Sequence, residues 1–406
     1  MGKPKIRFEG YSEDWEQRKL GDNIVEYTEK TTENNQYPVL TSSRKGIFFQ
    51  TDYYDGNQIA SADNTGYNIV PYGYFTYRHM SDDEIFHFNI NDIAENGIVS
   101  TLYPVFTTDE NLDSRYLQYQ LNYGREFARY AILQKQGGSR TYMYLNKLRN
   151  LYLTVPTAIE EQKKISEYFT NLDHLITLHQ RKYDETKTLK KYMLQKMFPQ
   201  NGEKVPEIRF DGFTEDWEQR KLGEVCEIKD SARIPNSEWS ESGIPYIRAS
   251  DVTNENTDGV LFISQERYEF YKNRTGAPTK NDVLFNGGGE IGKSLLITDE
   301  KPIYVQGGAV LYARTSKSRE LVGQYLKTYF ETTNAKSYID AASAGGTMRH
   351  FTLKPSQKMR ILMPSVEEQE KIGGYFVNLD RLITLHQRKC DELRSVKKFM
   401  LQNMFI

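Results

Sequence analysis

The segment 287–294 carries the residues whose types and spacing most directly suggest chemistry. It reads GGGEIGKS and matches the phosphate-binding loop, in which glycine N–H groups and a lysine hold nucleotide phosphates. Such a loop must open a helix, because the helix N-terminus binds the phosphate. The residues that follow, LLIT at 295–298 with Pro302 close behind, are instead typical of a strand and a turn. We therefore predict a glycine-rich hairpin, with a nucleotide-dependent enzyme using Lys293 as the less favoured alternative.

Other catalytic patterns are incomplete in this sequence. Val70-Pro71-Tyr72 resembles the Asn-Pro-Pro-Tyr motif of adenine methyltransferases, but it lacks the Asn and the second Pro. The six His residues show neither the HExxH pattern nor a close Cys/His spacing that would bind a metal. No nucleophile–base motif is found. The sequence therefore favours recognition over catalysis, and we predict no metal site.

Composition and charge narrow the class of protein. The chain has 406 residues, usually enough for two or three domains. Its net charge of −2 is less basic than that of a free-standing nucleic-acid binder, so partner subunits are expected to supply part of any phosphate contact. Cys226 and Cys390 are far apart, which indicates a reducing cytoplasm rather than a disulfide framework. We expect neither a signal peptide nor a membrane span, because no sufficiently long apolar run is present.

Three blocks of sequence occur twice, which identifies a tandem duplication. The matched pairs are IRFEGYSEDWEQRKLGD at 6–22 with IRFDGFTEDWEQRKLGE at 208–224, LDHLITLHQRK at 172–182 with LDRLITLHQRK at 379–389, and KKYMLQKMF at 190–198 with KKFMLQNMF at 397–405. A repeat of this kind has to be recognised before a fold is assigned, because each copy is one structural unit.

The stretches between the matched blocks differ. Residues 23 to about 136 share almost nothing with residues 225 to about 344, and the copies rejoin at the glycine pairs 137–138 and 345–346. Whole segments differ rather than loop tips alone. We therefore interpret the matched blocks as a fixed frame and the divergent middles as the carriers of specificity. The alternative is a duplicated structural domain whose loops have drifted.

Each copy predicts a long helix after a proline. Pro156 and Pro364 suit a first helical turn, and the Glu-Glu-Gln stretches behind them favour the positive end of the helix dipole. Apolar residues then recur at alternating steps of four and three, which predicts a heptad seam in a helix of about 40 residues, about 60 Å long. The predicted apolar seam residues are Phe169, Leu172, Ile176, Met193, Phe376, Leu379, Ile383, Leu393 and Met400. Two matched seams are most simply buried against each other.

These repeated blocks resemble the specificity subunit of type I restriction–modification systems. The resemblance rests on the doubled IRF-G-EDWEQRKLG block and on the doubled P-EEQ-KI…F-NLD-LI-LHQRK helix, and it covers the whole chain. GIPYIR at 243–248 is also similar to the opening of a target-recognition domain in that family. The resemblance implies an α+β fold with two globular target-recognition domains. Two long helices, packed as an antiparallel coiled coil with internal pseudo-two-fold symmetry, would join them.

The resemblance also implies a function. Each recognition domain would read one half of an asymmetric bipartite DNA target, and the helices would set the length of the unread spacer. The chain itself would be non-catalytic, without a cofactor or metal of its own. Its partners on double-stranded DNA would be two methyltransferase subunits, which use S-adenosylmethionine, and motor-nuclease subunits, which use ATP and Mg. The complex would be cytoplasmic and would not contact a membrane.

We expect the chain to divide at the edges of the matched blocks. The expected segments are an N-terminal frame segment at 1–22, target-recognition domain 1 at 23–155, a central long helix at 156–200, a repeat frame segment at 201–224, target-recognition domain 2 at 225–363, and a C-terminal long helix at 364–406. Two unlike middles in one frame predict a target whose two halves differ, since like surfaces would read like half-sites.

Contacts to DNA require polar or basic side chains on protruding loops. The candidates for DNA binding are Arg44, Lys45, Tyr77, Arg78, Arg140, Arg248, Asn286, Lys293, Arg349 and His350. An ordinary surface or strand-end role is the alternative for each of them. The basic residues in the C-terminal parts of both helices form either a solvated face or a weak surface for the DNA backbone. A scaffold that only joins protein partners is the third function considered.

Overall fold

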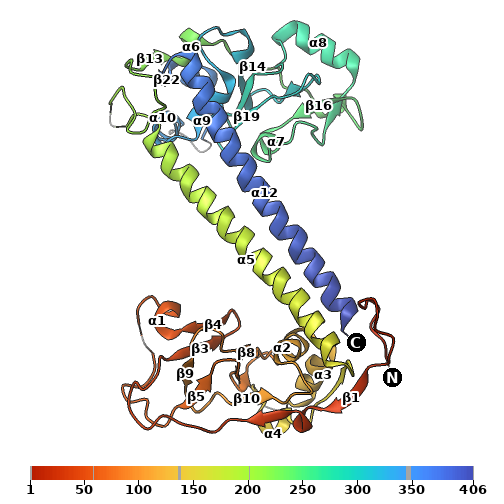
Figure 1. The fold of residues 1–406 in the computed structure, drawn as a ribbon. Helices are drawn as coiled ribbons and strands as arrows, with labels where there is room; N and C mark the ends of the chain where they lie inside the picture. The colour runs from red at the N-terminus through yellow and green to blue at the C-terminus, as the bar shows by residue number, and fades with distance from the viewer. Residues whose placement is uncertain (1, 58, 136–138, 201, 344–348, 406) are drawn as a thin grey trace. The chain divides into compact units, whose positions relative to one another are not determined.

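The chain divides into two compact units. The computed structural model describes residues 2–57, 59–135, 139–200, 202–343 and 349–405. Unit 1 contains residues 1–179 and 388–406, and unit 2 contains residues 180–387. Each unit therefore combines one divergent middle with parts of both long helices, as the colours of Figure 1 allow the reader to follow. The glycine pairs at which the copies rejoin lie outside the described residues.

A four-stranded antiparallel sheet forms the centre of the divergent middle in unit 1. Its strand order is β2 (Ile24–Glu26), β10 (Val105–Thr108), β6 (Phe75–Thr76) and β8 (Asn89–Ile90). Phe75 and Phe106 are partners in the β6–β10 register, and their rings stack with centroids 4.6 Å apart. Such a cross-strand aromatic pair stabilises the sheet beyond its buried area.

Shorter elements surround this sheet in unit 1. They are the strand pairs β3 (Leu40–Ser43) with β4 (Gly46–Phe49), β5 (Asn68–Pro71) with β9 (Asn96–Val99) and β7 (Met80–Ser81) with β11 (Thr141–Tyr142), the helices α1 (Gln50–Tyr53), α2 (Ser114–Tyr123), α3 (Arg125–Leu133) and α4 (Leu145–Leu148), and the 3-10 turn η1 (Leu20–Asp22). Asp113 caps α2, because its carboxylate accepts a hydrogen bond from the Tyr116 amide at 2.7 Å.

Unit 2 contains a sheet of the same topology. Its order is β14 (Ile228–Asp230), β21 (Val310–Ala313), β18 (Val283–Asn286) and β19 (Ser294–Leu296), so that in both sheets the first strand of the chain pairs with the last. Among the described residues, a second four-stranded sheet is particular to unit 2, with the order β15 (Trp239–Ser240), β17 (Phe262–Ile263), β16 (Ile244–Ile247) and β20 (Tyr304–Val305). The divergent middles therefore share a core sheet and differ in what is built around it.

The helices and turns of unit 2 cover these two sheets. They are α6 (Leu222–Val225), η2 (Asn236–Glu238), α7 (Ala249–Thr253), α8 (Gln265–Thr275), η3 (Thr315–Lys317), α9 (Gly323–Phe330), α10 (Thr333–Ala342) and α11 (Leu353–Lys358). Ser264 caps α8 and Thr332 caps α10, each through a side-chain oxygen that accepts an amide hydrogen bond of the first turn. Neither helix was apparent from the repeat alone.

In each copy, the repeated EDWEQRKLG block contains the first strand of the frame. In unit 1, β1 (Glu16–Lys19) pairs antiparallel with β12 (Tyr152–Val155), and in unit 2, β13 (Glu218–Lys221) pairs antiparallel with β22 (Arg360–Met363). β12 and β22 run directly into the prolines that precede the long helices. The matched block therefore holds the start of each long helix in place.

The two long helices are α5 (Ile159–Lys196), with 38 residues, and α12 (Val366–Met404), with 39 residues. In unit 1, Asp173 of α5 contacts Lys397 of α12 at 2.6 Å, and the Phe169 ring stacks on Phe405 with centroids 5.7 Å apart. From the first of these contacts to the second, the residue number decreases along α5 and increases along α12, so the two helices pack antiparallel. The predicted pair of long packed helices is therefore confirmed.

The packed faces of the helices follow the predicted spacing of four and three. Among the predicted seam residues, Phe169, Leu172, Phe376 and Leu379 are buried, and Ile176, Met193, Ile383, Leu393 and Met400 are half-buried.

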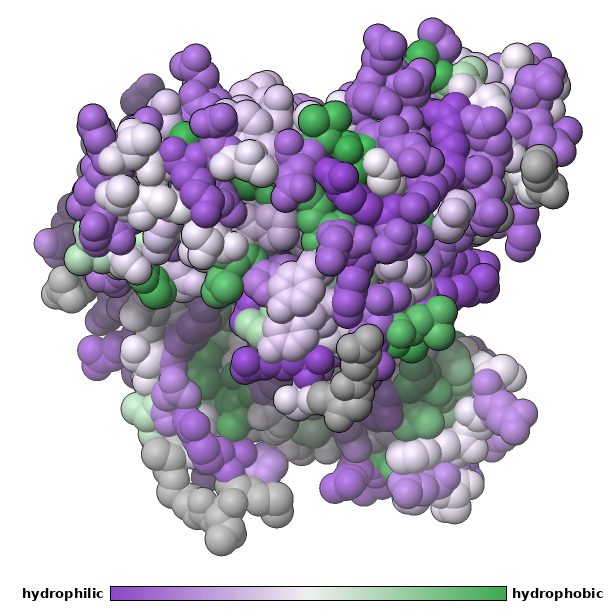
Figure 2. All heavy atoms as spheres, turned by 90° about the horizontal axis from the view of Figure 1, so that it is seen from below, coloured by the Kyte–Doolittle hydropathy of each residue, from purple (hydrophilic) through white to green (hydrophobic). Residues whose placement is uncertain are grey.

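No described helix is long and apolar enough to cross a membrane. The face of the molecule in Figure 2 is mostly hydrophilic, with hydrophobic side chains in small scattered groups.

Candidate functional site

Two arginines anchor the beginnings of the long helices. Arg7 donates two hydrogen bonds to Glu161, with Nε–Oε1 and Nη2–Oε2 distances of 2.7 and 2.8 Å. Arg209 donates the same two hydrogen bonds to Glu368, both at 2.8 Å. Each carboxylate is only 1% exposed, and the arginine that faces it supplies the opposite charge that a buried ion needs. The hydrogen bonds that the arginines donate to these carboxylates raise the pKa of both arginines above the ordinary value.

The glutamine that follows each of these glutamates connects the helix to the divergent middle. Gln162 donates to the Pro156 carbonyl at 3.0 Å and accepts from the Asp113 amide at 2.9 Å. Gln369 donates to the Pro364 carbonyl at 3.0 Å and accepts from an amide at the start of α9 at 2.9 Å. Both glutamine side chains are fully buried. The Glu-Glu-Gln stretch is therefore a structural connector in addition to its effect on the helix dipole.

The lysines in the predicted seam form ion pairs instead of apolar contacts. Lys397 Nζ lies 2.6 Å from Asp173 Oδ1 in unit 1, and Lys190 Nζ lies 2.6 Å from Asp380 Oδ1 in unit 2. The four residues occupy matched positions of the two copies. These pairs satisfy the charges that an apolar seam would otherwise leave without a partner.

The surface of unit 1 gathers basic side chains around one loop. We call residues 82–84, with the sequence Asp-Asp-Glu, the acidic loop. Its three carboxylates pair with Arg140, Arg44 and Lys135 in turn. The distances are 2.9 Å from Arg140 Nε to the first carboxylate and 2.8 Å from Arg44 Nη1 to the Asp83 carboxylate. Hydrogen bonds from Arg44 and from a neighbouring serine hydroxyl hold the pKa of Asp83 well below its usual range.

Aromatic rings lie beside the acidic loop. The His79 ring stacks on Tyr144 with centroids 4.9 Å apart, and Tyr144 stacks on Tyr142 with centroids 5.8 Å apart. Tyr142 and Tyr144 are 37% and 48% exposed, and Arg78 beside them is exposed as well. Cations and exposed ring faces next to each other are the groups that bind phosphates and nucleobases.

In unit 2 the basic candidates occupy separate elements. Arg248 Nε lies 3.1 Å from the Asp251 carboxylate at the start of α7, and Arg349 Nη2 lies 2.9 Å from Asp340 of α10. Lys293 lies on the turn between β18 and β19. Arg349, Lys293 and His350 are exposed, whereas Arg248 is half-buried. Arg140 and Arg349, which follow matched glycines, therefore pair with carboxylates from different kinds of element.

The segment 287–294 forms the β-hairpin that the sequence predicted. The Asn286 amide donates to the Lys293 carbonyl at 2.8 Å, and the chain continues directly into β19 without a helix. Gly289 and Gly292 have φ angles of +68° and +80°, which glycine adopts without strain. The segment therefore lacks the helix N-terminus on which a nucleotide site of this type depends.

Two of the candidate contact residues are buried. Tyr77 is 0% exposed and donates a hydrogen bond from its hydroxyl to the Met143 carbonyl at 2.8 Å. Asn286 is also 0% exposed and donates to the Ala249 carbonyl at 2.9 Å. Side chains without exposed surface do not reach DNA in this conformation, so we leave both out of the proposed contacts. Asn286 is the last residue of β18 and Tyr77 directly follows β6, and both side chains point into the interior, which a strand-end pattern in the sequence does not reveal.

Other features of the site were missed at the sequence level. Lys135, the acidic loop and the Tyr142–Tyr144 pair were not among the candidates, although SDDE at 81–84 and YMY at 142–144 are recognisable beside them.

Among the described residues, no group of three or more His, Cys, Asp or Glu side chains is placed to hold a metal ion.

The protein has two similar halves. In each half, a core sheet carries a variable surface and is joined to the long helices, which is the arrangement of two recognition domains on one shared frame. The sequence profile of the type I restriction modification DNA specificity domain matches twice, at residues 12–188 and 214–395, which together cover more than half of the chain. The chain therefore belongs to this family. It is a non-catalytic DNA specificity subunit of a type I restriction–modification system.

Relatives and a solved structure agree with this assignment. The chain is 22% identical to the MjaVIII specificity subunit of Methanocaldococcus jannaschii, over 75% of this chain and 73% of the relative. It is also 22% identical to the protein assigned as the MjaX specificity subunit of that organism, over 95% and 91%. The crystal structure of the type I S subunit from M. genitalium superposes with a TM-score of 0.60 at 13% identity, covering 100% and 99% of the two chains, and so shares the fold.

Proposed function

We propose that each unit reads one half of an asymmetric bipartite DNA sequence, while the long helices set the spacer and dock methyltransferase subunits. The observation that carries this proposal is the contrast between a repeated frame and unlike surfaces. The arginine–glutamate pairs at the starts of the long helices, Arg7–Glu161 and Arg209–Glu368, are alike, as are the core sheets. The groups presented on these cores differ, with the acidic loop and its cations in unit 1 and a second sheet in unit 2.

The proposed contacts of unit 1 are the exposed basic residues around the acidic loop. They are Arg44, Lys45, Arg78 and Arg140. An ion pair on the surface contributes little to stability, so a phosphate or a base edge can replace the carboxylate at small cost. The proposed contacts of unit 2 are Arg248, Lys293, Arg349 and His350. Double-stranded DNA is the ligand, and the methyltransferase and motor-nuclease subunits supply S-adenosylmethionine, ATP and Mg chemistry.

Methylome sequencing of cells that express this chain with its methyltransferase partner tests the division of labour. We expect exchange of residues 23–155 for the matching segment of another specificity subunit to change one half of the methylated sequence. Exchange of residues 225–363 should change the other half and leave the first intact. If either exchange altered both halves, the assignment of one half-site to each unit would be abandoned.

The proposed spacer function has its own test. Inserting one heptad at matched places in α5 and α12 adds about 10 Å of helix, which corresponds to about 3 base pairs of B-DNA. We expect a longer spacer between unchanged half-sites. An insertion in α5 alone breaks the register and serves as the control. Methylation at the original spacing by the double insertion variant would exclude the helices as the determinant of spacer length.

A scaffold without DNA contacts is the competing function. It is distinguished by comparing the affinity of the complex with methyltransferase subunits for cognate and scrambled duplexes at moderate salt. A specificity subunit that reads DNA has a clear preference for the cognate duplex. Equal affinity for the two duplexes would favour the scaffold.

A further inference from the structure

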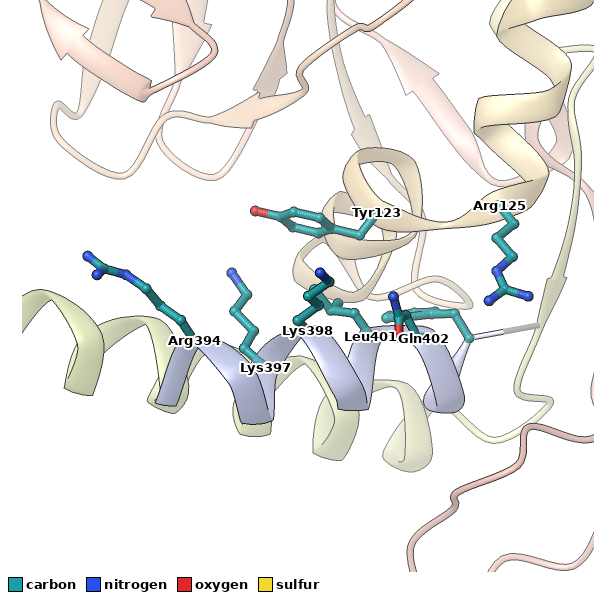
Figure 3. Close-up of a pocket in the computed structure, with 8 residues that line it drawn as sticks. Tyr123, Arg125, Arg394, Lys397, Lys398, Leu401 and Gln402 are labelled. Carbon is teal, nitrogen blue, oxygen red and sulfur yellow. The ribbon is translucent and has the colours of Figure 1, made fainter. Parts of the chain in front are cut away.

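A basic pocket lies in unit 1 between α12 and the junction of α2 with α3. Its volume is about 350 Å³, within the size range of ligand pockets. Arg394, Lys397 and Lys398 of α12 line one side, and Arg125 of α3 lines the other. Figure 3 shows Lys397 and Lys398 extending from α12 toward the Tyr123 ring, with Arg394 and Arg125 at the two ends. None of the side chains that line the pocket is acidic.

One of these cations is held rigidly. Lys397 Nζ lies 2.6 Å from Asp173 Oδ1, and it also lies 4.8 Å from the centre of the Tyr123 ring and 5.5 Å from that of Tyr119. Cation–π contacts of this kind stabilise a lysine over an aromatic face. Arg125 and Lys398 are exposed, so they are available to a ligand. The pocket therefore combines a fixed central cation with exposed cations around it.

The floor of the pocket is apolar. Leu401 is half-buried and Phe405 is 6% exposed, whereas Tyr123 is 45% exposed at the mouth. Such a floor gains stability when an apolar group covers it. A duplex presents its phosphates on a convex backbone and has no protruding apolar group to fill a concave pocket. An acidic peptide that carries an apolar side chain matches both the floor and the basic rim.

The matched place in unit 2 has a different charge. Lys190, the counterpart of Lys397, contacts two carboxylates, Asp380 and Glu331, each at 2.6 Å. The pocket around Lys190 is also lined by the acidic residues Glu255, Glu290 and Asp340. The excess of basic side chains is therefore confined to unit 1, although the helix residues of the two copies are closely matched.

We propose that this pocket docks an acidic segment of a protein partner, with an apolar side chain on Leu401 and Phe405 and carboxylates on Arg125 and Lys398. Because the pocket at the matched place of unit 2 is lined by several carboxylates, we expect one segment to dock per chain. This stoichiometry distinguishes it from the docking of two methyltransferase subunits proposed above. The inference goes beyond the reading of DNA and does not depend on it.

The probe for this site is a fluorescein-labelled peptide in which leucine and phenylalanine are flanked by glutamates. Fluorescence anisotropy with the full chain should give saturable binding with one site per chain. The analogue with glutamine in place of glutamate and the analogue with alanine in place of the apolar residues should each bind at least about tenfold more weakly, since the first loses charge-assisted contacts and the second loses buried apolar surface. A short non-cognate duplex should not displace the peptide.

The matched variants are Arg125→Glu with Lys398→Glu in the pocket, and Lys191→Glu at the position of unit 2 that corresponds to Lys398. All three side chains are exposed, so the fold should be retained, which circular dichroism checks. We expect the pocket variant to lose peptide binding at least tenfold and Lys191→Glu to change it less than twofold, since exposed charges are largely screened beyond the Debye length of about 8–10 Å at 0.10–0.15 M salt. Lys398→Glu alone provides the same test should the double variant unfold.

Several results would overturn the proposal. These are equal binding of the glutamine analogue, two equivalent sites per chain, equal loss in Lys191→Glu, or displacement of the peptide by the duplex, which would assign the pocket to nucleic acid. Methylome sequencing of the pocket variant separates this inference from the proposed function. An unchanged methylated sequence together with lost peptide binding supports the pocket as a site apart from DNA reading.

Discussion

Arg7 and Glu161 are joined by two hydrogen bonds although 154 residues separate them in the sequence. The Glu161 Oε1 atom also accepts from the Trp15 ring nitrogen at 3.4 Å. One buried carboxylate therefore connects both ends of the first matched block to the first turn of α5. Arg209 and Glu368 repeat the two arginine hydrogen bonds in the other copy, whereas the ring nitrogen of Trp217, the counterpart of Trp15, makes no hydrogen bond.

Removal of this carboxylate should destabilise unit 1. Glu161→Ala leaves the Arg7 guanidinium largely buried without its partner, which typically costs about 3–5 kcal/mol. We expect the free energy of unfolding, measured by urea titration and circular dichroism, to decrease by that amount. Glu368→Ala should have the same effect on unit 2. Glu160→Ala, at an exposed neighbour, is the control and should change stability by less than about 0.5 kcal/mol. A neutral result for Glu161→Ala would contradict the structural role of the arginine–glutamate pair.

The stability of unit 1 should decrease as the solution becomes mildly acidic. Burial, with the nearby charges of Arg44 and Lys397, lowers the pKa of His87 below its ordinary 6.5. The unfolded chain therefore binds a proton at His87 before the folded chain does, so the contribution of His87 is present above about pH 6.5 and is lost as the pH falls below it. Thermal unfolding between about pH 7.5 and 5.5 should show a smaller decrease for His87→Gln than for the wild type.

An exposed histidine of the same unit provides the control for this pH dependence. His174→Gln, on the exposed surface of α5, should keep the wild-type decrease. If His87→Gln and the wild type lost stability in parallel, another group would be responsible for the acid sensitivity.

The basic residues that pair with the acidic loop should affect DNA binding at one half-site. Arg44→Ala is expected to weaken binding of the cognate duplex by about tenfold, as befits the loss of one good contact. The slope of log affinity against log salt should also decrease by about one if the contact is to a phosphate. Arg115→Ala removes another arginine of unit 1 that pairs with a carboxylate, Asp92, and should leave the affinity unchanged. Equal effects of the two substitutions would show a nonspecific loss of charge.

Two adjacent glycines at the start of α12 should respond in opposite ways to alanine. A Cβ atom on Gly373 would lie 2.9 Å from Gln324 Cγ and 3.3 Å from the Tyr325 amide nitrogen, so α9 would have to shift. We expect Gly373→Ala to destabilise unit 2 by about 1–3 kcal/mol. A Cβ atom on Gly374 meets nothing within 4 Å, so Gly374→Ala should stabilise the helix by up to about 1 kcal/mol. Chemical denaturation of both variants measures these differences, and stabilisation by both would contradict the close packing of α9 on α12.

The frame could be predicted from sequence because its signals are local or doubled. Pro156 and Pro364 indicated the two helices, although they lie before the first residues Ile159 and Val366 and not in the first helical turns as predicted, and the heptad spacing marks the packed faces. The hairpin at 287–294 followed from the strand-like residues behind it. Each of these inferences needs only a short window of sequence and the comparison between copies.

The partners of buried polar groups could not be predicted in the same way. Glu161 looks like an ordinary acidic residue of a first helical turn, and only the fold brings Arg7 to it. Tyr77 and Asn286 resemble surface residues in the sequence, yet both side chains are fully buried. The common topology of these sheets was also hidden, because different side chains can pack on the same hydrogen-bonded strands.

The composition of unit 1 has a consequence for the order of folding during synthesis. Unit 2 is continuous from residue 180 to residue 387, whereas unit 1 requires residues 388–406, among them Phe405, which is buried in its core against Phe169 and Tyr116. On the ribosome all residues of unit 2 are made before the last segment of unit 1. The unit that begins first is therefore completed last, and its core is closed only after the whole of the other unit has been made.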